Sequence, residues 1–174
     1  MQLILLRGAP GCGKTTVAER LHAQFGSPWF EFGWIPEFRK RNPHSEMTYE
    51  EEEQMTFETL TLVVKNYMRH GFENIIVSDL SDARFAEVSA LFGDCDYRII
   101  TLYVENNDVI RERILGRDNG NEYRDWGSAI EINKRIKASA LLPHEYRVAT
   151  DGRDVSGVVS EVLAFCGDQI TGDR

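Results

Sequence analysis

Long hydrophobic runs are absent from the start of the chain, where a signal peptide or a membrane anchor would need one. Only four consecutive apolar residues, Leu3 to Leu6, follow Gln2 before Arg7 interrupts the run. A signal-peptide core takes about 7 apolar residues or more, and a membrane-spanning helix takes about 20. We therefore expect a cytoplasmic protein that makes no contact with a membrane.

Cysteine is scarce, and the cysteines form no pattern. Cys12, Cys95 and Cys166 are odd in number and widely spaced, and they include no C-x-x-C pair or histidine partner. Disulfide frameworks and zinc sites depend on such arrangements. The sequence therefore predicts structural thiols, and it argues against redox and metal-binding roles for them.

Positive charge is in short supply. The 174 residues include 20 Lys and Arg against 28 Asp and Glu, which gives a formal net charge of −8. Long-range attraction to a nucleic-acid backbone or an anionic membrane is unfavourable for such a chain. A small molecule is favoured over a polymer as the partner, although a local basic patch stays open as an alternative because Arg111, Arg113, Arg117 and Arg124 lie close together in sequence.

Internal repeats and linkers are also missing. Gly and Pro are scattered, and the longest charge run is Glu50 to Glu53. A length of 174 residues with 42% hydrophobic content is enough to fill one core. We therefore expect residues 1–174 to form a single domain.

Short apolar runs alternate with segments of helical periodicity. Strands are predicted at residues 3–6, 29–32, 74–77, 98–104 and 146–149. Helices are predicted at residues 15–25, 49–69, 83–92, 108–117, 129–140 and 155–165. A Thr48–Glu51 capping box opens the second helix, and Asp154 is the expected N-cap of the last. Five strands with helical crossovers predict an α/β fold in which helices cover both faces of a parallel sheet.

Residues 8–15, GAPGCGKT, fit the Walker A pattern G-x-x-x-x-G-K-[ST] between a predicted strand and a predicted helix. Glycines let successive N–H groups turn inward around phosphates, and the helix N-terminus adds partial positive charge. Lys14 is expected to reach the β- and γ-phosphates, and Thr15 to complete the coordination of Mg²⁺. The predicted nucleotide-binding residues of this loop are Gly8, Ala9, Pro10, Gly11, Cys12, Gly13, Lys14, Thr15 and Thr16.

A carboxylate ends the third predicted strand. Asp79 follows the run Ile75–Ser78, which places it at the carboxyl edge of the sheet, where ligands bind. It is predicted to join the Mg²⁺ shell or to accept a substrate proton, and capping of the next helix is the alternative. Arg84, five residues on, is a candidate to hold an anionic or hydroxylated substrate, unless it is a solvated surface residue.

An arginine-rich polar segment follows the fourth predicted helix region. Arg113 and Arg117 are one helical turn apart, and Arg124 lies inside the Gly-containing stretch from Asp118 to Asp125. The pattern predicts a lid at about residues 117–126 whose arginines close over the phosphates and exclude water. A plain surface loop is the alternative.

The last predicted strand leads into a turn at Thr150–Gly152. Such a turn is a place where an adenine ring rests against backbone groups. Asp151 and Gly152 are therefore further candidates for nucleotide binding, on a weaker signal than the glycine-rich loop.

In this order, the glycine-rich loop, the Asp-ended third strand, the arginine-rich lid and the Ala149–Gly152 turn resemble the P-loop small-molecule kinases, such as the shikimate, gluconate and adenylate kinases. The resemblance covers nearly the whole chain in element order, and only the loop is specific at the residue level. It implies a three-layer P-loop NTPase fold, a five-stranded parallel sheet of strand order 2-3-1-4-5, and a lid beside the ATP site.

Residues Pro28–Gly33 look like the stretch of chloramphenicol phosphotransferase in which Pro-Trp and Phe-Gly bracket the second strand. The resemblance implies a catalytic aspartate two residues after Phe-Gly. This chain has Ile35 there, which cannot abstract a proton, so chloramphenicol is not supported as the substrate.

The nearest carboxylates to that position are Glu31 and Glu37. We rank Asp79 first as base or metal-shell ligand, then Glu37, then Glu31, which is alternatively a buried partner of Lys14. Trp34 and Arg39 beside Glu37 are candidates for a substrate-pocket wall, with core packing as the alternative.

The sequence thus predicts an ATP- and Mg²⁺-dependent kinase that moves the γ-phosphoryl group to a hydroxyl of a small molecule. The predicted catalytic residues are Lys14, Asp79, Arg117, Arg124 and Glu37. One alternative is an ATPase or nucleotide switch that works through a protein partner, but the GTP-selecting Asn-Lys-x-Asp motif is absent. A second alternative is a 5′-hydroxyl polynucleotide kinase, which the net charge disfavours.

Overall fold

The computed structural model describes residues 1–34, 46–117 and 123–167. In these residues, five strands form one sheet: β1 (Leu3–Arg7), β2 (Trp29–Glu31), β3 (Ile75–Ser78), β4 (Tyr97–Tyr103) and β5 (Glu145–Ala149). Every neighbouring pair is parallel, and the strand order is β2-β3-β1-β4-β5. The predicted sheet and its order are confirmed.

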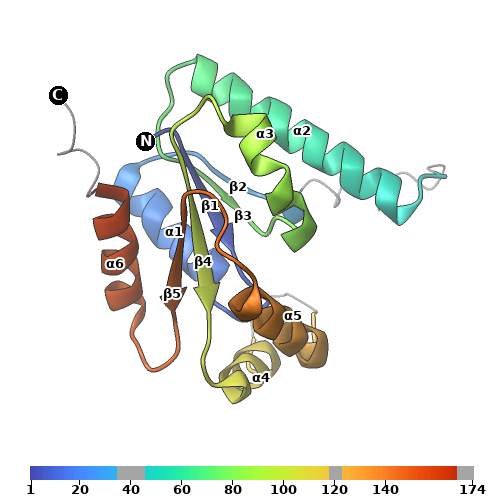
Figure 1. Cartoon of the computed structure of the whole chain (residues 1–174), viewed down its shortest axis with the longest axis vertical. Helices are drawn as coiled ribbons and strands as arrows, with labels where there is room; N and C mark the ends of the chain where they lie inside the picture. The colour runs from blue at the N-terminus through green and yellow to red at the C-terminus, as the bar shows by residue number, and fades with distance from the viewer. Residues whose placement is uncertain (35–45, 118–122, 168–174) are drawn as a thin grey trace.

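Helices cover both faces of this sheet (Figure 1). The α-helices are α1 (Lys14–Phe25), α2 (Tyr49–Arg69), α3 (Val88–Phe92), α4 (Asn107–Leu115), α5 (Trp126–Ala138) and α6 (Val155–Gly167). Two 3-10 helices, η1 (Phe32–Trp34) and η3 (Asp82–Ala86), follow β2 and β3. Helices α1 and α6 lie on one face, α2 and α3 lie on the other, and α4 and α5 lie at the end where the strand arrows point.

The alternation of side chains along β1 explains the two-sided core. Ile4 and Leu6 pack in one apolar cluster with residues of α1, α4 and α6, whereas Leu3 and Leu5 pack in a second cluster with residues of α2 and α3. Successive side chains of a strand point to opposite faces, so a strand buried on both faces must be apolar throughout. This is why the short run before the glycine-rich loop reads as continuously hydrophobic.

Two predicted helices differ from the observed ones by more than one or two terminal residues. The segment predicted as one helix at 83–92 is divided into η3 and α3, since Arg84 N–H and Glu87 N–H bond the carbonyl oxygens three residues earlier, as in a 3-10 helix, and Phe85 and Val88 on either side of the break both enter the core. Helix α5 begins at Trp126, three residues earlier than predicted, because the Asp125 side chain accepts the Ser128 N–H and caps it.

The predicted caps elsewhere are observed. Thr48 and Glu51 form the reciprocal bonds of a capping box at the start of α2, and Asp154 accepts the Gly157 N–H at the start of α6. Within the residues that the structure describes, no helix is both long enough and apolar enough to cross a bilayer.

Candidate active site

The glycine-rich loop, residues 8–13, connects β1 to α1 in a conformation that needs its glycines. Gly8 has φ 151°, and a Cβ atom there would lie 2.5 Å from the Leu102 carbonyl oxygen of β4. Gly13 has φ 94° and is the N-cap of α1. Any other residue would be strained at these two positions, so the loop stays tightly wound at the end of β1 with backbone N–H groups available for an anion.

Lys14 lies at the start of α1 and is almost fully buried. Its Nζ donates hydrogen bonds to the carbonyl oxygens of Gly8 at 2.9 Å and Ala9 at 3.3 Å, and it lies 3.5 Å from Asp79 Oδ1. Thr15 and Thr16, the next two residues, are exposed. The loop, the ammonium group and two hydroxyl side chains therefore meet at the N-terminus of α1, which favours negative charge.

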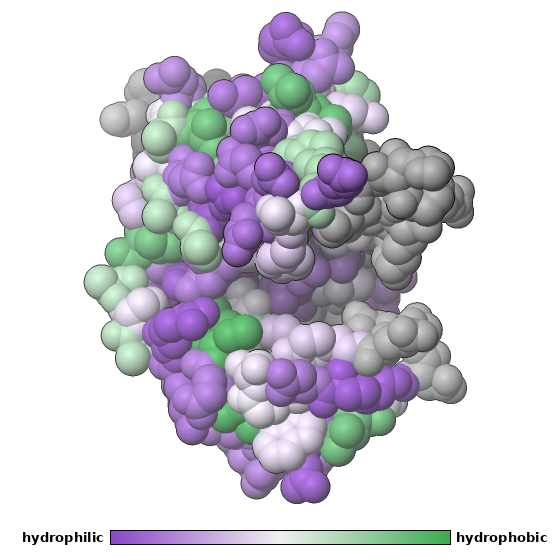
Figure 2. Space-filling view, turned by 90° about the vertical axis from the view of Figure 1, so that its right-hand side faces the viewer, coloured by the Kyte–Doolittle hydropathy of each residue, from purple (hydrophilic) through white to green (hydrophobic). Residues whose placement is uncertain are grey.

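A cavity of about 610 Å³ opens over this loop, within the usual size range of small-molecule sites. It is lined by Pro10, Gly11, Cys12, Gly13, Lys14, Thr15, Thr16, Val17, Glu31, Asp79, Arg113, Arg117, Tyr123, Thr150, Arg153, Val155 and Val158. These residues come from all five strand ends or the segments that follow them. Figure 2 shows that the surface near this end is hollowed between the part built on α2 and α3 and the part built on α4 and α5.

One side of the cavity carries two carboxylates. Glu31 ends β2 and pairs in register with Ser78, and Asp79 follows Ser78 directly. Trp29 Nε1, at the start of β2, donates to Ser78 Oγ at the end of β3 at 2.8 Å and so ties the two strands together. Burial raises the pKa of Glu31, and the negative charge of Asp79 adds to this, while Lys14 opposes it. Glu31 and Asp79 are therefore held side by side next to the lysine.

The other side of the cavity is built around Thr150, which follows β5. Arg113 on α4 donates to Thr150 Oγ1 and Thr150 O, each at 2.9 Å, and to Gly11 O at 3.3 Å. The Thr150 hydroxyl in turn donates to Cys12 O at 3.1 Å. Arg113, predicted to bind the nucleotide, thus lines the cavity, and its guanidinium joins the glycine-rich loop to Thr150.

The described ends of the predicted lid differ in where they point. Arg117 and Tyr123 line the cavity. Arg124 does not line it and donates to the carbonyl oxygen of Tyr123. Trp126, which the prediction gave to the lid, belongs to α5. Residues 118–122 lie outside the described residues.

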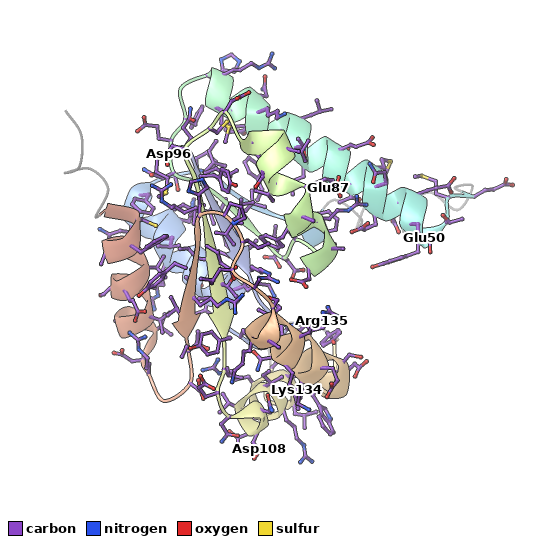
Figure 3. The ribbon with its side chains drawn as sticks, viewed as in Figure 1. Glu50, Glu87, Asp96, Asp108, Lys134 and Arg135 are labelled. Atoms are coloured by element: carbon purple, nitrogen blue, oxygen red, sulfur yellow. The ribbon has the colours of Figure 1, made fainter. Side chains whose placement is uncertain are left out.

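Arg84 is not brought to the cavity. Its guanidinium donates to both carboxylate oxygens of Glu53 and to Glu87, and it lies over the Phe57 ring at 4.9 Å from the centroid. Glu87 is labelled in Figure 3 on the side of the molecule away from α4 and α5. These contacts tie η3 to α2, so the guanidinium serves the packing of that helix and not the P-loop cavity.

Asp151 and Gly152 are also absent from the cavity lining. The Asp151 carboxylate accepts the backbone N–H groups of Glu105 and Asn106 at 2.8 to 3.0 Å. Burial opposes its charge, but these hydrogen bonds outweigh burial and lower the pKa of Asp151. The residue therefore fastens the turn after β5 to the turn after β4.

The side chains of three predicted substrate residues lie outside the part of the chain that the structure describes. Glu37 and Arg39 lie outside the described residues, and Trp34 is described only as the backbone end of η1. The ranking of Glu37 above Glu31 therefore stays a prediction.

Thr150 and Tyr123 were predicted only as members of the turn after the last strand and of the lid, and the sequence analysis missed four other cavity residues, Val17, Arg153, Val155 and Val158. Three of them come from the turn after β5 and the first turn of α6. A usable signal was present, since this turn follows a strand at the carboxyl edge, where loops form ligand sites in parallel sheets. The valines gave none, because an apolar residue on a helix reads as core.

Fold and site together define a P-loop protein with the architecture of the small-molecule kinases, as the sequence resemblance predicted. The chain belongs to the AAA domain family, whose model matches residues 4–134. No curated protein matches the chain in sequence.

Solved structures of kinases share the whole architecture. A gluconokinase from Sinorhizobium meliloti 1021 superposes with a TM-score of 0.68 at 16% identity, covering 97% of this chain and 93% of the gluconokinase. Shikimate kinase from Acinetobacter baumannii, in complex with shikimate, gives a TM-score of 0.62 at 17% identity over 98% and 96% of the two chains. The tunicamycin resistance protein of Deinococcus radiodurans gives a TM-score of 0.64 at 19% identity over 95% of both chains. At sequence identities of 16% to 19%, the structural likeness shows the fold alone.

Proposed function

We propose that this protein is a cytoplasmic, single-domain kinase that transfers the γ-phosphoryl group of ATP, with Mg²⁺, to a hydroxyl group of a small molecule. One observation carries the proposal: a single cavity joins the Walker A lysine to a pair of carboxylates on one side and to a partly apolar recess on the other. A site that only binds and releases a nucleotide needs one carboxylate for its Mg²⁺, and the second carboxylate, Glu31, supports a further task at this site.

The strand order supports a donor side and an acceptor side. Strand β1, which leads into the glycine-rich loop, lies in the middle of the order, with β2 and β3 on one side and β4 and β5 on the other. Glu31 and Asp79 therefore lie on the opposite side of the loop from Thr150 and α6. We assign the β2–β3 side to the phosphoryl acceptor and the β4–β5 side to the nucleoside.

The residues present fit ATP and Mg²⁺. The left-handed glycines wind the loop so that its N–H groups form an anion cradle, and Lys14 supplies a positive charge beside it. The exposed Thr15 hydroxyl and the Asp79 carboxylate are hard oxygen donors of the kind that Mg²⁺ prefers. When bound, Mg²⁺ supplies charge neutralisation for the phosphates.

The described residues then have separable tasks. Lys14 holds phosphate oxygens, and in doing so it exchanges its hydrogen bonds to the Gly8 and Ala9 carbonyls for bonds to the ligand. Asp79 and Glu31 accept hydrogen bonds from the acceptor and orient its hydroxyl, and one of them takes its proton. Arg117 adds positive charge where negative charge grows during transfer.

The names of the similar structures point to the kind of acceptor. A gluconokinase and a shikimate kinase share the fold over more than nine-tenths of this chain. By analogy with those kinases, we propose a hydroxylated metabolite or a small natural product as the acceptor here. The polynucleotide alternative has no observation in its favour.

The test is an ADP-release screen with intact protein, ATP and Mg²⁺ across sugars, polyols, nucleosides, aminoglycosides and small acids. At least one acceptor should raise ADP release well above the rate without acceptor, and mass spectrometry should show that acceptor gaining one phosphoryl group. ADP release that follows only added protein, RNA or DNA would contradict the proposal in favour of the switch or polynucleotide alternative.

A further inference from the structure

The Asp79 carboxylate depends on its backbone for its position. Among the described residues it accepts no hydrogen bond, and its charged partner is Lys14 Nζ at 3.5 Å. A Cβ atom on Gly33 would lie 3.5 Å from Asp79 Oδ2, so η1 lies directly against the carboxylate and offers it a CH₂ group there. The chain on either side of Asp79 therefore decides where the carboxylate lies in the cavity.

That chain is strained. Asp79 has φ 63°, and a residue with a Cβ atom keeps such a conformation only where the surrounding structure holds it. On the N-terminal side, the pairing of Ser78 with Glu31 holds the end of β3. Strand β3 ends at Ser78, so on the C-terminal side other contacts must hold the turn.

Side chains provide those contacts. The Ser81 hydroxyl donates to Glu53 Oε1 on α2 at 2.8 Å. At the next residue, Arg7 Nε on β1 donates to Asp82 Oδ1 at 2.7 Å. Two consecutive residues are thus anchored to different elements, α2 and β1, and the turn that carries Asp79 is held between these anchors and β3.

Glu53 is itself fixed as an ionised acceptor. Arg84 Nε lies 3.2 Å from both of its oxygens, and Arg84 Nη2 donates to Oε2 at 2.5 Å. These bonds hold the pKa of Glu53 below its usual value against the effect of burial, and the Ser81 hydroxyl adds to them. Arg84, which does not reach the P-loop cavity, therefore fixes the acceptor of the Ser81 bond.

We propose that Ser81 and Glu53 are positioning residues for phosphoryl transfer, because their hydrogen bond holds the strained turn that keeps the Asp79 carboxylate beside Lys14. The inference rests on the proposed function, since both residues act through Asp79. Neither side chain lines the P-loop cavity, so neither touches the ligand. Removing the anchor displaces a reacting group, which lowers kcat far more than it weakens binding.

The test is a double-mutant cycle on transfer from γ-labelled ATP to the acceptor found in the screen. Ser81→Ala removes one hydroxyl and should lower kcat by about tenfold, with ATP binding in calorimetry within about twofold of the wild type. In an Asp79→Asn background the same substitution should change the residual rate by less than about twofold, because the group that Ser81 positions is already lost. Glu53→Ala should give the same pattern.

Matched variants separate positioning from general stability, and the melting temperature of each is measured. Ser81→Thr keeps the hydroxyl on an extended backbone that suits threonine, and it should keep most of the turnover. Glu87→Ala removes the other carboxylate that Arg84 bonds, at 2.9 Å, and leaves the Ser81 contact intact. Ser89→Ala removes a serine hydroxyl that bonds Tyr97 instead. Both of these variants should turn over like the wild type.

The outcomes distinguish the inference from the proposed function. An equal loss of kcat from Ser81→Ala with and without Asp79→Asn would show that Ser81 acts on the fold in general. Unchanged kcat in Ser81→Ala, or normal turnover in Asp79→Asn alone, would show that there is nothing for Ser81 to position. Each of these results overturns the inference and leaves the kinase standing, whereas a wild type that transfers no phosphoryl group to any acceptor would contradict both.

Discussion

Asp79 combines a strained backbone with a place beside the Walker A lysine. It has φ 63°, a left-handed conformation that residues with a Cβ atom adopt rarely. Its carboxylate is about half exposed and lies 3.5 Å from Lys14 Nζ. Strain of this kind often marks functional sites, because only the surrounding structure makes it tolerable. The conformation aims the carboxylate at the cavity instead of continuing β3.

Replacing Asp79 by Asn keeps the shape and removes the charge. If Asp79 is the base or a metal-shell ligand, Asp79→Asn should lower kcat by at least about 100-fold, while ATP binding without Mg²⁺ hardly changes. Steady-state kinetics with the acceptor and calorimetry with ATP give the two numbers. Glu31→Gln, measured in parallel, should lower kcat by a smaller factor than Asp79→Asn does. Normal turnover in Asp79→Asn with an inactive Glu31→Gln or Glu37→Gln would reverse our ranking.

At this scale the sequence predicted the residues whose role depends on local spacing. The loop from Gly8 to Thr15 was found because its pattern and its neighbours are contiguous. The bonds of Arg84 and Asp151 were not predictable, because their partners, Glu53 and Glu105, are 31 and 46 residues away. Arg153 was missed for the same reason, since only the tertiary structure brings it to the glycine-rich loop.

Among the elements, the segment between α4 and α5 carries the clearest functional expectation. Arg117 lines the cavity, whereas Arg124 donates to the neighbouring Tyr123 carbonyl. Arg117→Ala should therefore lower kcat by about tenfold or more and change the ATP dissociation constant less, because charge on the phosphates is greatest in the transition state. Single-turnover rates and equilibrium binding measure the two effects.

Arg124→Ala is the matched variant for the same segment. It should show the same pattern with a smaller loss of kcat. A loss in kcat/KM of Arg117→Ala that comes wholly from KM would mean that this arginine only binds the nucleotide.

A buried ion cluster joins β1, β4 and β5 on the face toward η3. The fully buried carboxylate of Glu145 accepts bonds from Arg7 at 3.0 Å, Arg147 at 3.0 Å and Thr101 at 2.6 Å, and Arg7 also pairs with Asp82 at 2.7 Å. Arg135, labelled in Figure 3 on the side of α5 toward η3, lies 3.7 Å from Asp82. The cluster therefore connects the strand before the P-loop with the segment after Asp79 and with the helix after the lid.

Neutralising Glu145 should destabilise the protein, because two arginines lose a buried partner. We expect Glu145→Gln to lower the free energy of unfolding by about 3 kcal/mol in urea denaturation at pH 7. Glu131→Gln, which breaks the exposed pair with Lys134, is the control and should change stability little. Equal stability of the two variants would contradict the account of the cluster.

The same carboxylate predicts a dependence on pH. Burial works against the charge of Glu145, but bonds from Arg147, the Leu142 N–H and Thr101 outweigh it and lower the pKa of Glu145. A pKa that is lower in the folded than in the unfolded state stabilises the fold above about pH 4.5, and this contribution is lost as the pH falls through the folded value. The stability gap between the wild type and Glu145→Gln should therefore narrow below about pH 4.5.

Element types were more predictable than element ends. All five strands were expected within two residues of their observed bounds, because each is a short apolar run between breakers. Two element ends were not predictable. The break between η3 and α3 depends on the packing of Phe85, and the early start of α5 depends on the cap by Asp125. Periodicity alone does not distinguish a 3-10 turn from the first turn of an α-helix.

On the scale of the whole molecule, an acidic chain places several cations at one cavity. The net charge is −8, yet among the described residues Lys14, Arg113, Arg117 and Arg153 all line the same site against two carboxylates, Glu31 and Asp79. This distribution favours an anionic ligand such as ATP at the carboxyl ends of the strands. Composition predicted that nucleic acid is disfavoured as a partner, with a local basic patch left open, and only the fold shows how positive charge gathers at this cavity.

The central claim is phosphoryl transfer at the Walker A loop, and the Lys14→Ala variant tests it most directly. Transfer from γ-labelled ATP to the acceptor found in the screen is measured for the wild type and for Lys14→Ala, together with the melting temperature of both. We predict that transfer falls below about 1% of the wild-type rate while the variant stays folded, because the Lys14 ammonium group bonds only loop carbonyls and Asp79 among the described residues. A folded Lys14→Ala variant that keeps most of its turnover would contradict the assignment of a P-loop kinase.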